Sequence, residues 1–185
     1  MDERAAIDVE DCTRCSALPD SRRQIVNGVG PVDADVVFVG EAPGEQEDRE
    51  GEPFVGRSGT LLDDVLAEHE LDRQTVRITN AVKCRPPENR DPTTTELRNC
   101  RDYLERELEA IDPVVIVTLG KVPTEHLLDR SVAVTAEAGT SEQVTIRGAT
   151  YRVLIGIHPA ATLYDPSTRD TFDAVIAEAA ALLEG

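Results

Sequence analysis

Short apolar runs alternate along the chain with segments whose apolar residues recur every three or four positions. The apolar runs are bounded by glycine, proline or polar residues, which is typical of buried strands. The strands predicted in this way comprise residues 35–39, 76–80, 114–120, 143–147 and 151–157. Because the last two flank the turn residues 147–149, they are expected to form a hairpin.

Helical periodicity follows several of these runs. The apolar residues between 61 and 66 recur at helical spacing, so a helix is predicted to begin near Ser58 or Gly59. Residues 93–95 supply an N-cap for a long helix downstream. The helices predicted after this point comprise 96–111, 121–130 and 172–182.

Strands that alternate with helices predict a three-layer α/β/α fold with a mostly parallel central sheet, as one domain over residues 1–185. Ligands bind such sheets beyond the carboxyl ends of the strands. The segments that follow Gly40, Asn80 and Ile157 begin at such ends, so we expect them to converge on one site. The first is long, polar and rich in turn formers (residues 40–59), and the second contains prolines that exclude a helix or a central strand.

Acidic residues are spread over the whole chain. There are 36 Asp and Glu against 19 Lys and Arg, which gives a net charge of −17, and only Lys83 and Lys121 are lysines. This charge ordinarily argues against a nucleic-acid partner, because phosphate binding needs cationic surface. At molar salt, however, the Debye length shrinks to about 3 Å, so only close and well-placed cations matter. We interpret the composition as that of a protein from a halophilic source, adapted to a salt-rich cytoplasm.

No apolar run approaches the roughly 20 residues that are needed to cross a bilayer. The N-terminal residues 1–11 are charged where a signal peptide is apolar. We therefore expect a cytoplasmic protein with no membrane contact.

The chain contains four cysteines: Cys12 and Cys15 form a C-x2-C pair, and Cys84 and Cys100 follow. Such a pair holds a metal centre from one tight turn, and two further thiolates complete the ligands of zinc or of an iron-sulphur cluster. Two disulfides and unrelated buried thiols are the alternatives, although a cytosolic chain would keep disulfides reduced. Sulphur ligands alone do not separate zinc from a cluster. With no histidine ligand and no open position, the expected role is structural.

Three groups of motifs follow the strand ends that are expected to converge. They are GEAPG, ED and GEPFVGRSG at residues 40–44, 47–48 and 51–59, then NAVKCRPP at 80–87, and HPAA at 158–161. Together they resemble the signatures of family 4 uracil-DNA glycosylases. The resemblance extends from about Asp11 to Asp173.

The resemblance implies a DNA-repair hydrolase that acts on uracil in DNA, releases the free base and leaves an abasic site. It also implies that the four cysteines hold a [4Fe-4S] cluster, with zinc as the alternative cofactor. One departure stands out: the family usually continues HPAxLLRNP, whereas this chain reads HPAATLYDP. A backbone-contacting arginine is therefore missing from this loop.

The chemistry of uracil release needs three things: extrusion of the base, recognition of its edge and stabilisation of the departing anion. The side-chain amide of Asn80 can donate to uracil O4 and accept from N3–H. Phe54 suits base stacking, the alternative being an ordinary core aromatic. His158 can donate to uracil O2 as negative charge builds there, the alternative being a structural histidine.

Two carboxylates of the first motif group admit two interpretations. Taken alone, Glu41 and Glu47 near a glycosidic bond suggest a general base and an acid. The resemblance implies instead that Glu41 shapes the uracil pocket and that Glu47 excludes the methyl group of thymine. Ala42 also belongs to the expected uracil-binding set and stands where a related family places a water-activating aspartate, so a dissociative mechanism is expected.

Contact with DNA must come from local cations. Residues 83–101 carry five basic against three acidic side chains, an excess that marks the phosphate-facing side. The residues expected to bind DNA are Arg57, Lys83, Arg85 and Lys121; scattered surface charges are the alternative. We expect a monomer that acts on single- or double-stranded uracil-containing DNA, and a replication or repair protein as a possible partner.

Two other functions are compatible with the same residues. One is a glycosylase that acts on other deaminated bases, hypoxanthine or xanthine, in the same pocket. The other is a non-catalytic cluster protein that binds DNA. The second predicts that substitution of Asn80 or His158 leaves function intact, whereas the enzymatic interpretation predicts loss of uracil discrimination.

Overall fold

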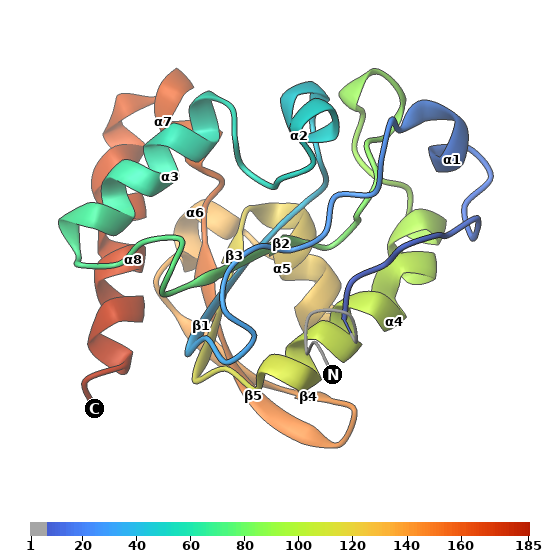
Figure 1. The fold of residues 1–185 in the computed structure, drawn as a ribbon. Coiled ribbons are helices and arrows are strands. Elements are labelled where there is room, and N and C mark those ends of the chain that lie inside the picture. Colours follow the sequence, from blue (N-terminus) through green and yellow to red (C-terminus); the bar gives the residue numbers. More distant parts are fainter. Residues whose placement is uncertain (1–6) are drawn as a thin grey trace.

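One five-stranded sheet forms the centre of the computed structural model, which describes residues 7–185 (Figure 1). In the order β2-β1-β3-β5-β4, the strands are β2 (Arg77–Asn80), β1 (Val36–Gly40), β3 (Val115–Leu119), β5 (Ala149–Gly156) and β4 (Ser141–Ile146). The pairings β1–β2, β1–β3 and β3–β5 are parallel, and only β4 runs antiparallel to its neighbour β5. The predicted strands and the hairpin are confirmed and differ only at their ends. Part of the charged N-terminal stretch, residues 1–6, lies outside the described residues.

The helices surround this sheet and include the four that periodicity predicts. The helices are α1 (Leu18–Ser21), α2 (Glu45–Glu50), α3 (Arg57–Glu68), α4 (Thr94–Ile111), α5 (Lys121–Leu128), α6 (Val134–Glu137), α7 (Pro159–Tyr164) and α8 (Arg169–Leu182), with 3₁₀ turns η2 (Pro87–Asn89) and η3 (Pro166–Thr168). The helix α2 lies inside the segment that was expected to be a loop. Its sequence EQEDRE has no apolar periodicity, and its acidic first turn is stabilised by the helix dipole instead.

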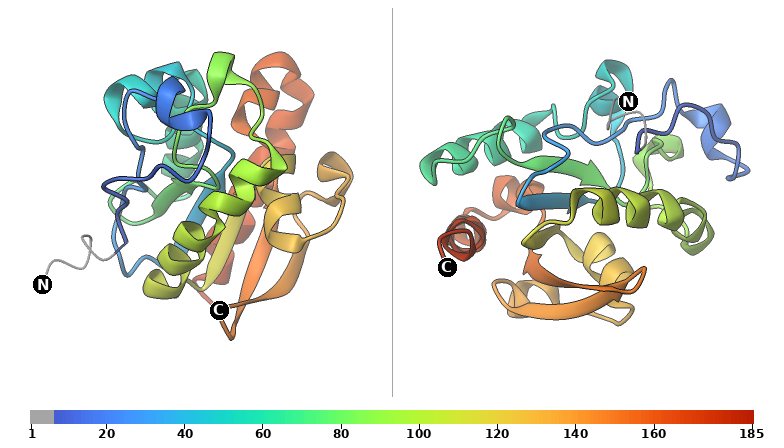
Figure 2. Two further views of the ribbon diagram at one scale, coloured as in Figure 1. Left: turned by 90° about the vertical axis from the view of Figure 1, so that its right-hand side faces the viewer. Right: turned by 60° about the horizontal axis from the view of Figure 1, so that its bottom comes forward.

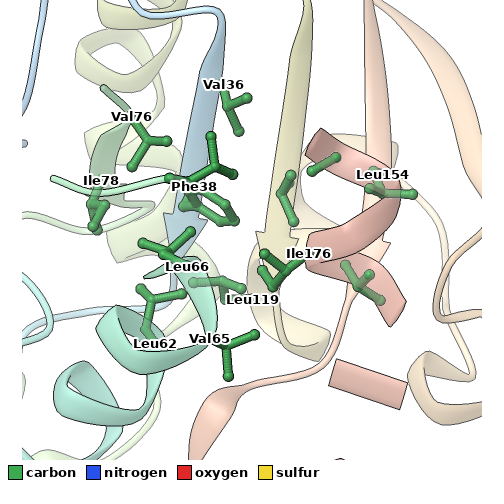
Figure 3. Packing of buried hydrophobic residues seen from close by; sticks show 14 of the residues in the cluster. Val36, Phe38, Leu62, Val65, Leu66, Val76, Ile78, Leu119, Leu154 and Ile176 are labelled. Carbon is green, nitrogen blue, oxygen red and sulfur yellow. The ribbon is translucent and has the colours of Figure 1, made fainter. Parts of the chain in front are cut away.

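One face of the sheet packs against α3 and α8. The core on this side joins residues of the strands, among them Phe38 and Leu119, to Leu62 and Leu66 of α3 and to Ile176 of α8 (Figure 3). All five of these side chains are fully buried. This packing fixes the orientation of α3, whose first turn borders the candidate site.

The opposite face of the sheet packs against α4 and α5. Strand residues such as Val37 and Ile116 contact Leu104 and Leu108 of α4 and Leu127 of α5. Figure 2 shows these helices on the side of the sheet away from α8. Two helical layers on a mostly parallel sheet confirm the predicted three-layer α/β/α fold.

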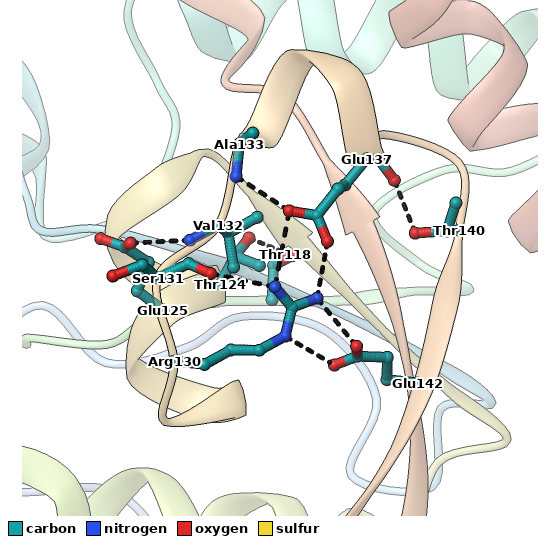
Figure 4. Close-up of polar contacts among 10 residues, drawn as sticks. All are labelled: Thr118, Thr124, Glu125, Arg130, Ser131, Val132, Ala133, Glu137, Thr140 and Glu142. Carbon is teal, nitrogen blue, oxygen red and sulfur yellow. Dashed lines mark hydrogen bonds and ion pairs between the residues drawn. The ribbon is translucent and has the colours of Figure 1, made fainter.

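Surface ion pairs fasten the connection between α5 and α6 to the edge strand β4. The Arg130 guanidinium donates to Glu137 at 2.7 Å and to Glu142 at 2.8 Å (Figure 4). The Glu137 carboxylate also accepts from the backbone N–H of Ala133. These contacts hold the start of β4 beside the carboxyl-terminal half of β5, where Glu142 pairs with Val153.

A buried charge network joins β2 to α4. Lys83 Nζ donates to Glu107 Oε2 at 2.6 Å, and Arg77 Nε donates to Glu107 Oε1 at 3.1 Å. Burial by itself raises the pKa of Glu107, but the charges of Lys83 and Arg77 outweigh it and hold that pKa below its ordinary value. The side chain of Lys83 pairs with this interior carboxylate, and the residue is only 3% exposed.

The prediction that Lys83 binds DNA is therefore wrong. The lysine follows a strand end and precedes a run of basic residues, which is why its sequence position suggested exposure. Its partner Glu107 lies on α4, far along the chain, so the pattern around Lys83 held no sign of the pairing.

Within residues 7–185, no helix has both the length and the apolar character needed to cross a membrane.

Candidate functional site

A cavity of about 630 Å³ opens at the carboxyl ends of the parallel strands. Its walls come from the segments that follow β1, β2 and β5. The lining residues are Ala42, Gly44–Glu47, Arg49, Phe54, Gly56–Gly59, Asn80, Asn89, His158, Ala160, Leu163 and Tyr164. Figure 1 shows α2 and α7 along the corresponding edge of the molecule. The expected convergence of three segments on one site is confirmed.

Asn80 lies at the end of β2, opposite Gly40 at the end of β1. It is almost fully buried, with its side chain on the cavity wall. A Cβ atom on Gly40 would lie 2.5 Å from Asn80 Oδ1 and 2.6 Å from the Phe54 ring. Glycine at position 40 is thus what allows the amide and the ring to meet beside the strand end.

Phe54 has an unusual backbone for a bulky residue, with φ at +55°. Such a left-handed conformation costs of order 1–3 kcal/mol and persists only where the surroundings enforce it. The ring centroid lies 5.7 Å from that of the His158 imidazole, with the planes 33° apart. The same ring belongs to the hydrophobic core that contains α3 and α8. Phe54 is thus both a core aromatic and a wall of the cavity.

Glu47 braces the loop that carries Phe54. Its Oε1 accepts from Gly44 N–H at 3.0 Å, and its Oε2 accepts from Val55 N–H at 3.2 Å and from Gly56 N–H at 3.1 Å. Both carboxylate oxygens therefore bind backbone donors on either side of the loop. The carboxylate lines the cavity and holds its shape, which sequence spacing alone did not reveal.

His158 caps the first turn of α7. Its Nδ1 accepts a hydrogen bond from Ala160 N–H at 3.0 Å. Burial lowers the pKa of His158 below its ordinary value of 6.5, and the charge of Glu47 opposes this only in part. The ring is therefore neutral near pH 7. Because Nδ1 is an acceptor, the single ring proton is assigned to Nε2, which is a hydrogen-bond donor.

Glu41 does not line the cavity, although it adjoins residues that do. Its backbone carbonyl accepts from Val82 N–H at 3.0 Å, which ties the loop after β1 to the segment after β2. Burial raises the pKa of Glu41 to about 8, and the hydrogen bond and charge of Asp91 add to the effect. The carboxyl group is therefore largely protonated near pH 7.

A second, smaller cavity is lined by all four cysteines: Cys12, Cys15, Cys84 and Cys100. None of them forms a disulfide. Arg22 Nη1 lies 3.2 Å from Cys84 Sγ, and Asn99 Nδ2 lies 3.6 Å from Cys15 Sγ. Four thiols from three separate segments, with donors aimed at their sulphurs, match the donor set of a four-thiolate metal centre. The disulfide alternative is wrong.

The cations predicted to bind DNA occupy different places around the first cavity. Arg57 is exposed at the start of α3 on the cavity wall, and Lys121 is exposed at the start of α5. Arg85 is half-buried and donates to Asn89 Oδ1 at 2.7 Å. Arg57 and Lys121 thus have accessible charges, whereas Arg85 positions an amide at the cavity.

Sequence reasoning missed several lining residues. Arg49 lies on α2, a helix that was not predicted, and its guanidinium forms an ion pair with Glu45. Asn89 has a left-handed backbone that no local pattern indicated. Tyr164 is 89% exposed at the cavity mouth. For Tyr164 a signal was available, because a tyrosine stands there where the family that the sequence resembles usually has an arginine.

Comparison with known proteins connects this geometry to a family. The family model described as the uracil DNA glycosylase superfamily matches residues 27–180. A type-4 uracil-DNA glycosylase of Archaeoglobus fulgidus is 43% identical over 170 residues, which cover 90% of this chain and 85% of that protein.

Two further relatives have the same description. The type-4 uracil-DNA glycosylase of Sulfurisphaera tokodaii is 41% identical over 172 residues, covering 90% of this chain and 78% of that protein. The type-4 uracil-DNA glycosylase of Thermotoga maritima is 46% identical over 132 residues, covering 71% of this chain and 68% of that protein.

Proposed function

The chain belongs to the uracil-DNA glycosylase superfamily, and from this premise we propose that it hydrolyses the N-glycosidic bond of uracil in DNA. The reaction releases free uracil and leaves an abasic site, as the first step of base excision repair. The observation that carries the proposal is the meeting of Asn80, Phe54 and His158 in one cavity at the strand ends.

Asn80 is proposed to read the edge of the extruded base. Its amide nitrogen would donate to uracil O4, and its amide oxygen would accept from N3–H. Cytosine presents the opposite pattern and would leave two buried polar groups unpaired, at a cost of about 1–3 kcal/mol each. The nearly complete burial of Asn80 makes this discrimination effective, because water cannot satisfy the unpaired groups.

Phe54 and His158 are proposed to hold and then release the base. Stacking on the Phe54 ring contributes about 1–3 kcal/mol to binding of the flipped base. The Nε2–H of the neutral His158 would donate to uracil O2 as the N1–C1′ bond breaks and its electron pair moves into the base. Ala160 N–H fixes the tautomer that makes this donation available.

The bond cleavage is proposed to be dissociative. Ala42 on the cavity wall offers no water-activating group, and Glu41 is protonated near pH 7, so neither acts as a general base. An oxocarbenium-like sugar and a uracil anion would form first, and water would then add to C1′ and give up a proton that neutralises the uracil anion. Glu41 is assigned to shaping the pocket, and Glu47 to bracing the loop and occupying space beside the base.

The four cysteines are proposed to hold a [4Fe-4S] cluster, with zinc as the alternative. When bound, the centre would link the N-terminal arm (residues 7–30), the segment after β2 and the helix α4, and it would supply no step of the hydrolysis. The arm already contacts that segment, since Val26 N–H donates to the Lys83 carbonyl at 2.7 Å. An absorbance spectrum of anaerobically purified protein distinguishes the two, because only the cluster absorbs visible light.

DNA is proposed to lie across the cavity mouth, in single- or double-stranded form. Arg57 is the assigned phosphate contact on the wall, with Lys121 beyond it and Arg85 acting through Asn89. Exposed Tyr164 offers an aromatic surface where the family has a cation. A single domain over residues 1–185, a monomeric state, a cytoplasmic location and a replication or repair partner belong to the same proposal.

The proposal is tested by incubating the protein with oligonucleotides that contain uracil, hypoxanthine or xanthine, over a range of KCl concentrations. We expect release of uracil and strand cleavage at the abasic site after alkali treatment. Preferential release of hypoxanthine or xanthine would support the alternative glycosylase. No release of any base, with DNA binding retained, would support the non-catalytic cluster protein.

A further inference from the structure

Arg73 lies in the connection between α3 and β2 and reaches back to the loop that carries Phe54. Its Nη1 donates to the carbonyl of Pro53 at 2.9 Å, and its Nη2 donates to the carbonyl of Phe54. On its other side, Nε donates to Asp63 Oδ1 at 2.7 Å. One guanidinium thus joins two consecutive carbonyls of the loop to a carboxylate on α3.

We propose that Arg73, oriented by Asp63, is a positioning residue that fixes the left-handed backbone of Phe54 and so sets the ring against which uracil stacks. The inference rests on the proposed function, because it assigns a role in uracil binding to a residue outside the cavity. Arg73 is not among the cavity-lining residues, so its effect on uracil must pass through the loop carbonyls of Pro53 and Phe54 that it contacts.

The backbone at Phe54 needs such a constraint. Its φ of +55° is one that a bulky side chain rarely adopts without support. The start of α3 adds to the constraint from one side, since a Cβ on Gly59 would lie 1.7 Å from the Phe54 carbonyl oxygen. The planar, forked guanidinium holds that carbonyl and its predecessor in one orientation, which a lysine cannot do with a single ammonium group.

The location of Arg73 separates this role from general stabilisation. The side chain of Arg73 is 23% exposed and that of Asp63 is 48% exposed. Because the Asp63 carboxylate is half exposed, solvent screens the ion pair and limits its contribution to the stability of the whole fold. A small displacement of a side chain that positions the substrate, in contrast, slows a reaction strongly. Loss of Arg73 should therefore affect catalysis much more than unfolding.

The test uses Arg73→Met and Arg73→Lys in the full-length protein, with single-turnover uracil release and thermal unfolding as readouts. We expect Arg73→Met to slow release by roughly tenfold with little change in Tm, and Arg73→Lys to fall between it and the wild type. Asp63→Asn should reproduce part of the loss. The matched control is Arg169→Met. It breaks an exposed ion pair with Glu68, which lies on α3 as Asp63 does, and it should leave uracil release unchanged.

A double-mutant cycle with Phe54→Leu tests whether Arg73 acts through the ring. In the Phe54→Leu background, Arg73→Met should cause no further loss of rate, because the ring it positions is absent. A full additional loss in that background would overturn the proposal. So would an Arg73→Met variant with normal release and a lowered Tm, since that is the signature of a merely structural residue.

A readout that is independent of catalysis comes from the neighbouring imidazole. Because the Phe54 ring lies 5.7 Å from the His158 ring, its orientation influences the proton resonances of His158. Arg73→Met should shift these NMR resonances and leave those of His126 unchanged. An unshifted His158 contradicts the inference. If the wild-type protein releases no uracil while the His158 shift is observed, the proposed function fails and the positioning contact stands.

Discussion

At the scale of single residues, Glu41 distinguishes two accounts of bond cleavage. A general base must be ionised at the working pH, whereas burial and Asp91 raise the pKa of Glu41 to about 8. The folded protein therefore keeps this carboxyl group protonated over a range in which the unfolded chain ionises it. Its contribution to stability is complete below pH 4.5 and is lost as the pH rises through about 8.

This assignment predicts that Glu41→Gln retains uracil release at pH 7, because the amide resembles the protonated carboxyl group in shape and charge. The variant should also lose less stability than the wild type as the pH rises from about 5 to about 8. Rate measurements and thermal unfolding across this range check both statements. Glu109→Gln, which alters an exposed pair with Arg147, is the control. A loss of release at pH 7 of 100-fold or more, ~2.7 kcal/mol, would favour the general-base account.

The meeting of three site residues was readable from the sequence. Asn80, Phe54 and His158 each stand in a segment that leaves a strand end, and the rule for parallel sheets predicts that such segments meet. The tautomer of His158 was not readable, because it depends on the N–H of Ala160 in the folded turn. The exposure of Lys83 was predicted wrongly, since its burial depends on the distant Glu107.

At the scale of secondary-structure elements, the capped helix α4 shows what local sequence determines. Thr93 accepts from Glu96 N–H at 3.1 Å, and the Glu96 carboxylate accepts from Thr93 N–H at 2.9 Å. This reciprocal capping depends only on a local pattern of four residues, so the start of α4 was predicted closely. The helix α2 has no apolar face of its own, and its position depends on contacts such as those of Asp48 with residues 23 and 24.

The proposed cysteine centre would act at the same scale, because its four ligands come from the N-terminal segment, the segment after β2 and the helix α4. We expect Cys100→Ser to lose the visible absorbance and to expose the N-terminal arm, residues 7–30, to limited proteolysis. The sheet should survive, since its two cores do not include the cysteines. Circular dichroism and mass spectrometry of the fragments measure both effects. An arm that stays protected after complete loss of metal would show that the centre does not hold it.

At the scale of the whole molecule, the main feature is the large net negative charge. A net charge of −17 on 185 residues produces self-repulsion that opposes the compact state. Salt screens this repulsion, and the Debye length falls from about 10 Å at 0.1 M to about 3 Å at 1 M. The same screening would let an acidic protein approach DNA closely enough for the proposed contacts of Arg57 and Lys121.

We therefore predict that Tm rises when KCl is increased from 0.1 M to 2 M. Uracil release should persist at the higher concentration, because salt screens the long-range repulsion between the acidic protein and DNA while close contacts remain. Differential scanning calorimetry and the release assay provide the measurements, with an uncharged osmolyte as the control for general exclusion effects. A Tm that falls with KCl would contradict the interpretation of the composition as an adaptation to salt.

The fold as a whole followed from the order of its elements more than from their details. Alternating strands and helices predicted the sheet and both helical layers, whereas the depth of the cavity depended on packing that no local pattern encodes. The close approach of Gly40 to Asn80 and Phe54 is an example. It arises from the register of β1 against β2, which becomes visible only in the assembled sheet.

The central claim is that the cavity at the strand ends recognises uracil through the Asn80 amide. The most direct measurement compares single-turnover release of uracil by Asn80→Ala with release by the wild type. Asn27→Ala, which removes an amide that binds the backbone of Val9, is the control. The account predicts a loss of roughly 100-fold for Asn80→Ala with an unchanged Tm and visible spectrum. Release at the wild-type rate by a folded Asn80→Ala protein would contradict it.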